Sequence, residues 1–203
     1  MLVVGGGPAG SSCAWALRRA GRDAVVMDAA RFPRDKVCAG WITTQVVDDL
    51  EIDLDDYRRG RTLQPITGFR TGLIGGAGVV ETAYDRIVSY GIRRCEFDHY
   101  LLARSGARLC LGAPARSIRR DGDAWIVNDT LRASMLVGAG GHFCPVARLL
   151  SPRSASAPVV AAQETEFPID PSSRGPSLVR GVPGEARRHS RRWKASDRSV
   201  RSA

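Results

Sequence analysis

The sequence has no long hydrophobic run: no apolar stretch approaches the roughly 20 residues that a membrane-spanning helix requires. Metal-binding patterns are also missing. The three histidines and five cysteines are scattered, without a Cys-x-x-Cys pair or a histidine at a spacing that suits zinc. An odd cysteine count, with no signal-like segment before Leu2, is typical of reduced thiols. We therefore expect a cytoplasmic protein with no transmembrane segment and no metal site.

Most of the net charge lies at one end of the chain. The formal net charge is +9, and nine Lys and Arg follow Asp170 against two acids, Glu185 and Asp197. Residues 1–170 are therefore close to neutral, and the basic character belongs to the last segment. Nucleic-acid binding is one alternative. However, the last segment has a single aromatic residue, Trp193, and the rest shows no basic face, so we expect no nucleic-acid partner.

Residues 172–203 differ in composition from the rest of the chain. Arg, Ser, Pro and Gly dominate there, and the hydrophobic periodicity ends near Pro171. A segment of this kind buries too little apolar surface to offset the entropy of ordering it. We predict a folded region over residues 1–171 and a disordered basic tail over residues 172–203.

Residues 1–28 predict a strand, a helix and a second strand. Leu2–Val4 is a short apolar run that ends in three glycines, and Ala24–Met27 is a second such run. Between them, Ala9–Ala20 has apolar and basic residues at helical spacing, and Gly21 follows as a common helix stop. Two strands joined by a helix pair in parallel through a right-handed crossover. The segment therefore predicts a Rossmann-type α/β unit.

The run Gly5-Gly6-Gly7-Pro8-Ala9-Gly10 fits the pattern G-x-G-x-x-G between a predicted strand and a predicted helix. The first glycine permits a tight turn, the second a close approach to a pyrophosphate, and the third close packing of helix on strand. N–H groups at the helix start donate to phosphates, and an acid at the end of the second strand binds a ribose hydroxyl. A purely structural glycine turn is the alternative. The predicted dinucleotide-binding residues are Gly5, Gly7, Pro8, Ala9, Gly10 and Asp28.

The rest of the chain alternates helical and strand patterns. Helices are expected at Thr43–Leu50 and Glu96–Ser105, and strands at Leu63–Ile74, Val79–Tyr84, Val88–Ile92, Arg116–Arg120, Trp125–Val127 and Ser134–Val137. The first two of these strands should form an antiparallel pair, and Asp121-Gly122 is a hairpin signal. We expect an α/β fold: a Rossmann-type parallel sheet with an inserted antiparallel β-sheet.

Three segments resemble the geranylgeranyl reductase family of flavoproteins, which are relatives of the FAD-dependent aromatic hydroxylases. Arg31-Phe32-Pro33-Arg34-Asp35-Lys36-Val37-Cys38-Ala39-Gly40-Trp41 is similar to the family's F-P-R-x-K-x-C-x-G segment. Arg94-Cys95-Glu96-Phe97-Asp98, continuing to Leu101, is similar to its R-x-x-F-D-x-x-L element, whose arginine lies near the FAD phosphates. Leu136-Val137-Gly138-Ala139-Gly140-Gly141 is similar to its strand-end G-A-D-G segment, with Gly140 in place of the aspartate of many relatives.

The resemblance implies FAD as the cofactor and NAD(P)H as an electron donor, with part of a substrate-domain sheet inside residues 1–171. Arg34, Lys36 and Arg94 would offset the negative charge of the FAD pyrophosphate by charge-assisted hydrogen bonds, and Gly138 would lie beside the cofactor. Cys38 is the candidate catalytic residue, facing the flavin. The alternatives are a solvated charged loop for the basic residues and a buried structural thiol for Cys38.

The activity that the resemblance implies is redox chemistry on a small organic substrate. In a reductase, reduced FAD gives a hydride to a carbon–carbon double bond of an isoprenoid-like molecule. In the alternative, a monooxygenase, the flavin reacts with oxygen and hydroxylates the substrate. The F-P-R-x-K-x-C segment favours the reductase. The family's G-D-A-x-G element is missing from the sequence, so a third expectation is a truncated or frameshifted chain, an inactive FAD-binding fragment. Nothing in the sequence indicates an oligomeric state.

Overall fold

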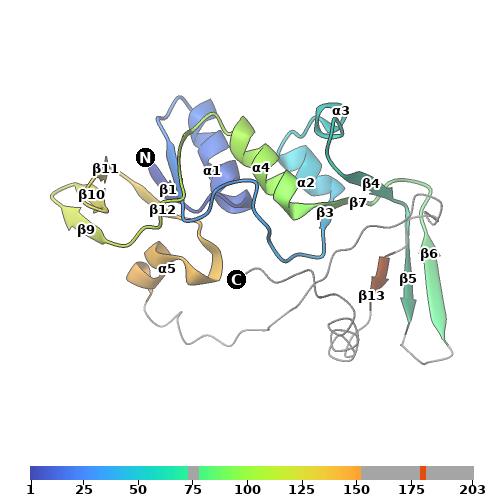
Figure 1. Ribbon diagram of the computed structural model, residues 1–203. Coiled ribbons are helices and arrows are strands. Elements are labelled where there is room, and N and C mark those ends of the chain that lie inside the picture. The colour runs from blue at the N-terminus through green and yellow to red at the C-terminus, as the bar shows by residue number, and fades with distance from the viewer. Residues whose placement is uncertain (73–77, 152–178, 182–203) are drawn as a thin grey trace. The chain divides into compact units, whose positions relative to one another are not determined.

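The computed structural model describes residues 1–72, 78–151 and 179–181 (Figure 1). These residues divide into two compact units. The first unit contains Met1–Lys36, Asp55–Arg61 and 93–151, and the second contains Val37–Leu54, Thr62–Ile92 and Val179–Gly181. Most of the second unit is therefore inserted, in sequence, between parts of the first.

A four-stranded parallel sheet forms the centre of the first unit. Its strands are β1 (Leu2–Val4), β2 (Val25–Asp28), β8 (Arg108–Leu111) and β12 (Leu136–Gly138), in the order β12-β1-β2-β8. Leu2 at the start of β1 pairs with Val25 of β2 and with Leu136 of β12. All pairings in this sheet are parallel, which confirms the predicted Rossmann-type α/β fold.

Two helices, α1 (Pro8–Arg19) and α4 (Arg94–Arg104), lie side by side against one face of this sheet (Figure 1). Val3 and Val26 point to that face and pack with Ala14 of α1 and Leu102 of α4. Because successive side chains of a strand point to opposite faces, the neighbours of Val3 are directed to the other side of the sheet.

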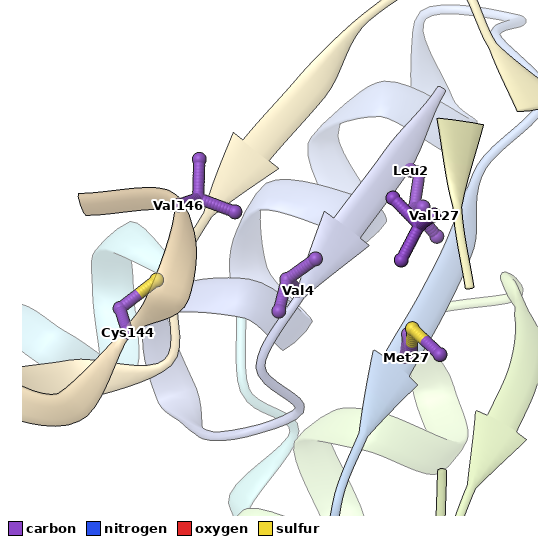
Figure 2. Close-up of a cluster of buried hydrophobic side chains, with 6 residues drawn as sticks. All are labelled: Leu2, Val4, Met27, Val127, Cys144 and Val146. Carbon is purple, nitrogen blue, oxygen red and sulfur yellow. The ribbon is translucent and has the colours of Figure 1, made fainter. Parts of the chain in front are cut away.

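The opposite face of the sheet is buried as well, as Figure 2 shows. Two further elements cover it: an antiparallel sheet of order β11-β10-β9, and the helix α5 (Pro145–Leu150) with the preceding 3₁₀ turn η1 (Gly141–Phe143). The strands are β9 (Ile118–Asp121), β10 (Ala124–Val127) and β11 (Leu131–Ala133). The cluster consists of Leu2, Val4, Met27, Val127, Cys144 and Val146. Burial on both faces explains why the central strands β1 and β2 are continuous apolar runs.

The second unit is built from two small sheets and a short helix. One sheet has the order β3-β7-β4, with β3 (Trp41–Thr43), β4 (Leu63–Ile66) and β7 (Ser89–Ile92), all antiparallel. The other has the order β13-β5-β6, with β5 (Gly68–Gly72), β6 (Val79–Ala83) and β13 (Val179–Gly181). The helix α2 (Thr44–Asp49) follows β3 and is capped by the Thr43 side chain. β4, β5, β6 and β7 are the inserted antiparallel strands that the sequence predicts, whereas β3 and β13 were not predicted.

The predicted strand Leu63–Ile74 is divided into two strands that belong to different sheets. β4 pairs with β7, and β5 pairs with β6. Pro65, which has no backbone N–H, is tolerated because β4 lies at a sheet edge. At Gly68 a Cβ would lie 2.7 Å from the Thr82 carbonyl oxygen, so the chain crosses into the second sheet by a close backbone approach.

Residues 172–203 were expected to be disordered. Within that segment the structure describes Val179–Gly181, which forms β13 and pairs in parallel with β5. The remaining residues of the segment lie outside the described part of the chain, as do the predicted boundary at 171 and residues 73 and 74 of the Leu63–Ile74 strand. The prediction of disorder therefore stays a prediction there.

Tyr57, at the end of the short helix α3 (Leu54–Tyr57), is a buried residue of the first unit. Its ring meets the rings of Phe97 and Tyr100 edge to face, with centroids 5.9 Å and 5.0 Å away. Its hydroxyl has no hydrogen-bond partner among the described residues. Burial is the main cause that raises the pKa of Tyr57, so the hydroxyl stays neutral at ordinary pH.

We expect Tyr57→Phe to leave the free energy of unfolding unchanged or to raise it by up to about 1 kcal/mol, because removing an unpaired buried hydroxyl removes a desolvation cost. Urea denaturation followed by circular dichroism measures this. Tyr57→Leu is the control, and should destabilise by more than about 1 kcal/mol, since it removes two aromatic contacts. A clear loss of stability in Tyr57→Phe would contradict the assignment of an unpaired hydroxyl.

Candidate dinucleotide-binding site

Where β1 leads into α1, the backbone of two glycines, Gly5 and Gly10, lies in close contact with other backbone groups. Gly5 has φ +113°, donates its N–H to the Met27 carbonyl at 2.8 Å, and has the Ala139 carbonyl where a Cβ would lie. Gly10 lies against the Gly5 carbonyl oxygen, so a Cβ there would overlap the backbone of the loop. Both glycines are therefore required for the close packing of α1 at the carboxyl end of β1.

Gly7 has a different environment from Gly5 and Gly10. Its backbone is extended, with φ −69° and ψ −176°, which any residue adopts. One described heavy atom, Nη2 of Arg34, lies within 4 Å of an added Cβ, at 3.4 Å. A side chain at Gly7 would thus occupy the space beside the helix start without meeting the protein backbone. This glycine keeps open a cradle that a ligand can fill.

The cradle lies at the N-terminus of α1. Gly7 is the N-cap, Pro8 occupies the first turn, and no acidic side chain lies in that turn. The backbone N–H groups of the first turn have no intrahelical acceptor. They carry the positive end of the helix dipole. A helix of 12 residues with this start is suited to bind a phosphate group.

Asp28 holds the loop from the end of β2. Its Oδ2 accepts the Gly6 N–H at 2.6 Å, and its Oδ1 accepts the Ala30 N–H at 2.8 Å. The Phe32 ring also lies next to Gly6, 3.2 Å from where a Cβ would lie. A carboxylate has about four acceptor positions, so each Asp28 oxygen can also accept a ribose hydroxyl while it keeps its backbone bond.

Two arginines of the first unit meet one buried carboxylate, Asp98, which is fully buried. Arg94, the first residue of α4, donates to it from Nε at 2.7 Å and from Nη2 at 3.0 Å. Nη2 of Arg34 lies 3.4 Å from Asp98 Oδ2, and the Arg34 guanidinium lies 4.8 Å above the Phe32 ring. The same Nη2 is the atom beside Gly7. Asp98 is thus shared by two guanidinium groups, and one of them, that of Arg34, also lies next to the cradle.

The other predicted site residues lie in different surroundings. Gly138 ends β12 and is exposed, although an added Cβ would lie 2.8 Å from Val146 Cβ. Lys36 is exposed at the end of a segment of the first unit. Cys38 is half-buried and belongs to the second unit. Cofactor contacts by Gly138 and Lys36 and a catalytic role of Cys38 stay predictions.

Sequence reasoning assigned no role to Asp98 or Phe32, although both lie inside the quoted motifs. The signal for Asp98 was its spacing of four residues from Arg94, which places the two side chains on one helix face. Phe32 gave no such signal, because a contact between a loop residue and the turn at Gly6 has no characteristic sequence spacing. Within the described residues, no group of three or more His, Cys, Asp or Glu side chains is arranged to hold a metal ion. Nor is any helix in that part of the chain long and apolar enough to span a membrane.

Comparisons with known proteins agree with this geometry. Residues 3–56 match the family described as NAD(P)-binding Rossmann-like domain. A menaquinone reductase of Mycobacterium tuberculosis is 36% identical over 169 residues, which cover 75% of this chain and 40% of that protein. The chain therefore spans about 40% of the length of the curated relatives it matches.

Two solved structures share the fold. A geranylgeranyl bacteriochlorophyll reductase-like protein of Thermoplasma acidophilum is 21% identical, with a TM-score of 0.60 over 79% of this chain and 43% of that one. The halogenase PltM, in complex with phloroglucinol and FAD, is 18% identical, with a TM-score of 0.60 over 73% of this chain and 35% of that one. At these identities the similarity establishes the fold alone.

We expect Gly7→Val to weaken the binding of FAD at least about tenfold, because the side chain fills the cradle that a pyrophosphate needs. The free energy of unfolding should change by less than about 1 kcal/mol, since the Gly7 backbone is unstrained. Flavin fluorescence titration and urea denaturation measure the two effects.

Gly10→Ala is the matched control for Gly7→Val. Its Cβ meets the Gly5 carbonyl oxygen, so it should lower the stability by about 1–3 kcal/mol. Wild-type FAD affinity in a natively folded Gly7→Val protein would show that the cofactor does not occupy the cradle.

Proposed function

We propose that this chain, which has the nucleotide-binding fold of FAD-dependent oxidoreductases, binds FAD and forms the cofactor-holding part of a reductase. The substrate we propose is a small organic molecule with a polyprenyl chain, and the reaction is the reduction of a carbon–carbon double bond in that chain. NAD(P)H is the proposed source of electrons.

The observation that carries the proposal is the open side of Gly7 at the N-terminus of α1. The helix N-terminus and the Arg34 guanidinium border this space, and the Asp28 carboxylate binds the N–H of the preceding residue, Gly6. The donors and Arg34 suit the two negative charges of a pyrophosphate, and Asp28 suits the ribose hydroxyls of the adenosine half. Asp28 would repel a ribose 2′-phosphate, so NADP fits this space poorly.

FAD is favoured over NAD by the relatives. PltM was solved with FAD bound, and the three sequence segments that resemble the geranylgeranyl reductase family include the loop that carries Arg34 and the helix that carries Arg94. When FAD is bound and reduced, its isoalloxazine ring supplies the hydride. The residues of this chain bind the pyrophosphate and the ribose, and thereby fix where the ring lies.

The substrate class is supported by the names of two relatives. Menaquinone, in the name of the Mycobacterium tuberculosis protein, and geranylgeranyl, in the name of the Thermoplasma acidophilum protein, both denote molecules with polyprenyl chains. Addition of a hydride to one carbon of a double bond and of a proton to its neighbour gives a saturated bond, and two electrons leave the reduced cofactor. The chain spans less than half of these relatives, so the proposal concerns the activity of a protein of their length.

The first test is direct binding of FAD to the purified 203-residue chain. We expect saturable quenching of flavin fluorescence with one FAD per chain, and competition by ADP but not by riboflavin, because the described residues surround the pyrophosphate and ribose. Failure of FAD to bind at any accessible concentration would refute the cofactor assignment.

The second test concerns the reaction itself. Reduced FAD and a polyprenyl quinone are incubated with a protein of the relatives' length that contains this chain and, separately, with the 203-residue chain, and each product is analysed by mass spectrometry. A gain of two hydrogen atoms in the polyprenyl chain is the expected result for the longer protein. A gain of one oxygen atom in the presence of air would indicate the alternative monooxygenase, and the absence of any product despite bound FAD would indicate an inactive FAD-binding fragment.

Arg94→Ala should weaken FAD binding by about 1.5–3 kcal/mol, because it removes a cation beside the site and leaves the buried Asp98 carboxylate without its bidentate partner. Arg93→Ala is the matched control, since Arg93 is half exposed and pairs with Glu96 at 3.3 Å. Its effect should stay below about 1 kcal/mol. If calorimetry finds equal effects, or a larger one for Arg93, the arginine motif has been placed wrongly.

A further inference from the structure

Asp98 is a fully buried carboxylate on a face of α4 that is otherwise apolar. Its buried neighbours on the helix are Phe97, Tyr100, Leu101 and Leu102. A carboxylate in such surroundings is costly unless it is paired and hydrogen-bonded. Arg94 on the same helix meets this requirement with two hydrogen bonds, one to each carboxylate oxygen. The charge of Asp98 is therefore neutralised within α4.

Arg34 is a second cation at the same carboxylate. It comes from a loop 64 positions earlier in the chain, and its side chain is only 20% exposed. Two groups fix its guanidinium: the Phe32 ring and Asp98, whose Oδ2 lies 3.4 Å from Nη2. In this position Nη2 borders the open side of Gly7. A free arginine side chain on a loop would sample many rotamers, and holding it in one of them costs conformational entropy. The folded chain meets that cost before any ligand arrives.

The geometry points to Asp98 as a positioning residue for the binding of a nucleoside diphosphate ester. Asp98 fixes Arg34 beside Gly7, and Arg34 is the group that contacts the pyrophosphate together with the N–H groups of α1. Arg94 already pairs with both oxygens of Asp98, so the Arg34 guanidinium, which has five N–H donors, keeps donors for an anion. This inference rests on the proposed FAD site and assigns its preorganisation to a residue that does not touch the ligand.

The test is a double-mutant cycle on the full 203-residue chain with Asp98→Asn and Arg34→Gln. Affinities are measured for FAD and ADP, which carry a pyrophosphate, and for adenosine, which does not. Asp98→Asn should weaken FAD and ADP about tenfold and adenosine less than about twofold, because only the pyrophosphate uses Arg34. In the Arg34→Gln background the same Asp98 substitution should change the FAD affinity less than about twofold, since its effect passes through Arg34.

A purely structural role for Asp98 would give a different pattern. The loss would then be equal for adenosine and FAD, or would persist in full when Arg34 is already replaced, and either result overturns the inference. So does an unchanged FAD affinity in a folded Asp98→Asn protein.

Asp98→Glu covers the case in which Asp98→Asn does not fold. It keeps the negative charge for Arg94 and displaces the carboxylate by one methylene, so FAD binding should weaken while adenosine binding does not. Wild-type affinity for FAD in this variant contradicts the positioning role.

Binding of ADP and of FAD to the wild-type chain tests the proposed function independently of this inference. Binding of ADP without FAD would refute the FAD assignment while the cycle still tests Asp98 with ADP. Binding of neither would refute both.

Discussion

The approach of α1 to the end of β1 depends on one missing atom, the Cβ of Gly10. The Gly5 carbonyl oxygen occupies the place of that atom, and Gly5 itself is held in a left-handed conformation against Ala139. These contacts are made by backbone groups, which cannot move aside as a side chain can. They set the direction of α1, and with it the direction in which its first N–H groups point. The anion site at Gly7 is a consequence of this packing.

Two acidic side chains hold the donors and cations of the anion site in place. Asp28 takes the Gly6 and Ala30 N–H groups, and Asp98 takes two guanidinium groups. Each acid thereby fixes donors or cations in place, while the first turn of α1 contains none that would cancel its dipole. Preorganised donors in partly buried surroundings bind an anion without the cost of first ordering them.

The sequence could predict the parts of the fold that depend on local pattern. The strand–helix–strand unit, the glycine loop with Asp28, the helix that begins near Arg94 and the hairpin at Asp121-Gly122 all follow from periodicity and turn residues, and the structure has them. β3, β8, β11, β13, α3 and α5 were not predicted. β8 is an edge strand, and two of its four residues are exposed, so its apolar pattern is weak. The division of Leu63–Ile74 between two sheets depends on a long-range backbone contact at Gly68, which no local pattern encodes.

Within the site too, the residues that follow a local pattern were predicted, and the long-range contacts were not. Gly5, Gly7, Gly10 and Asp28 were predicted because the phosphate-binding turn imposes a fixed spacing on one continuous segment. The roles of Arg34 and Asp98 depend on each other across 64 positions, and only the folded chain brings them together. A halogenase and a reductase-like protein share the fold of this chain at 18% and 21% identity, so the fold tolerates wide changes of sequence. The Arg34–Asp98 pair is a long-range contact, because it joins the loop after β2 to α4. Through this contact a buried carboxylate holds the Arg34 cation beside the glycine loop.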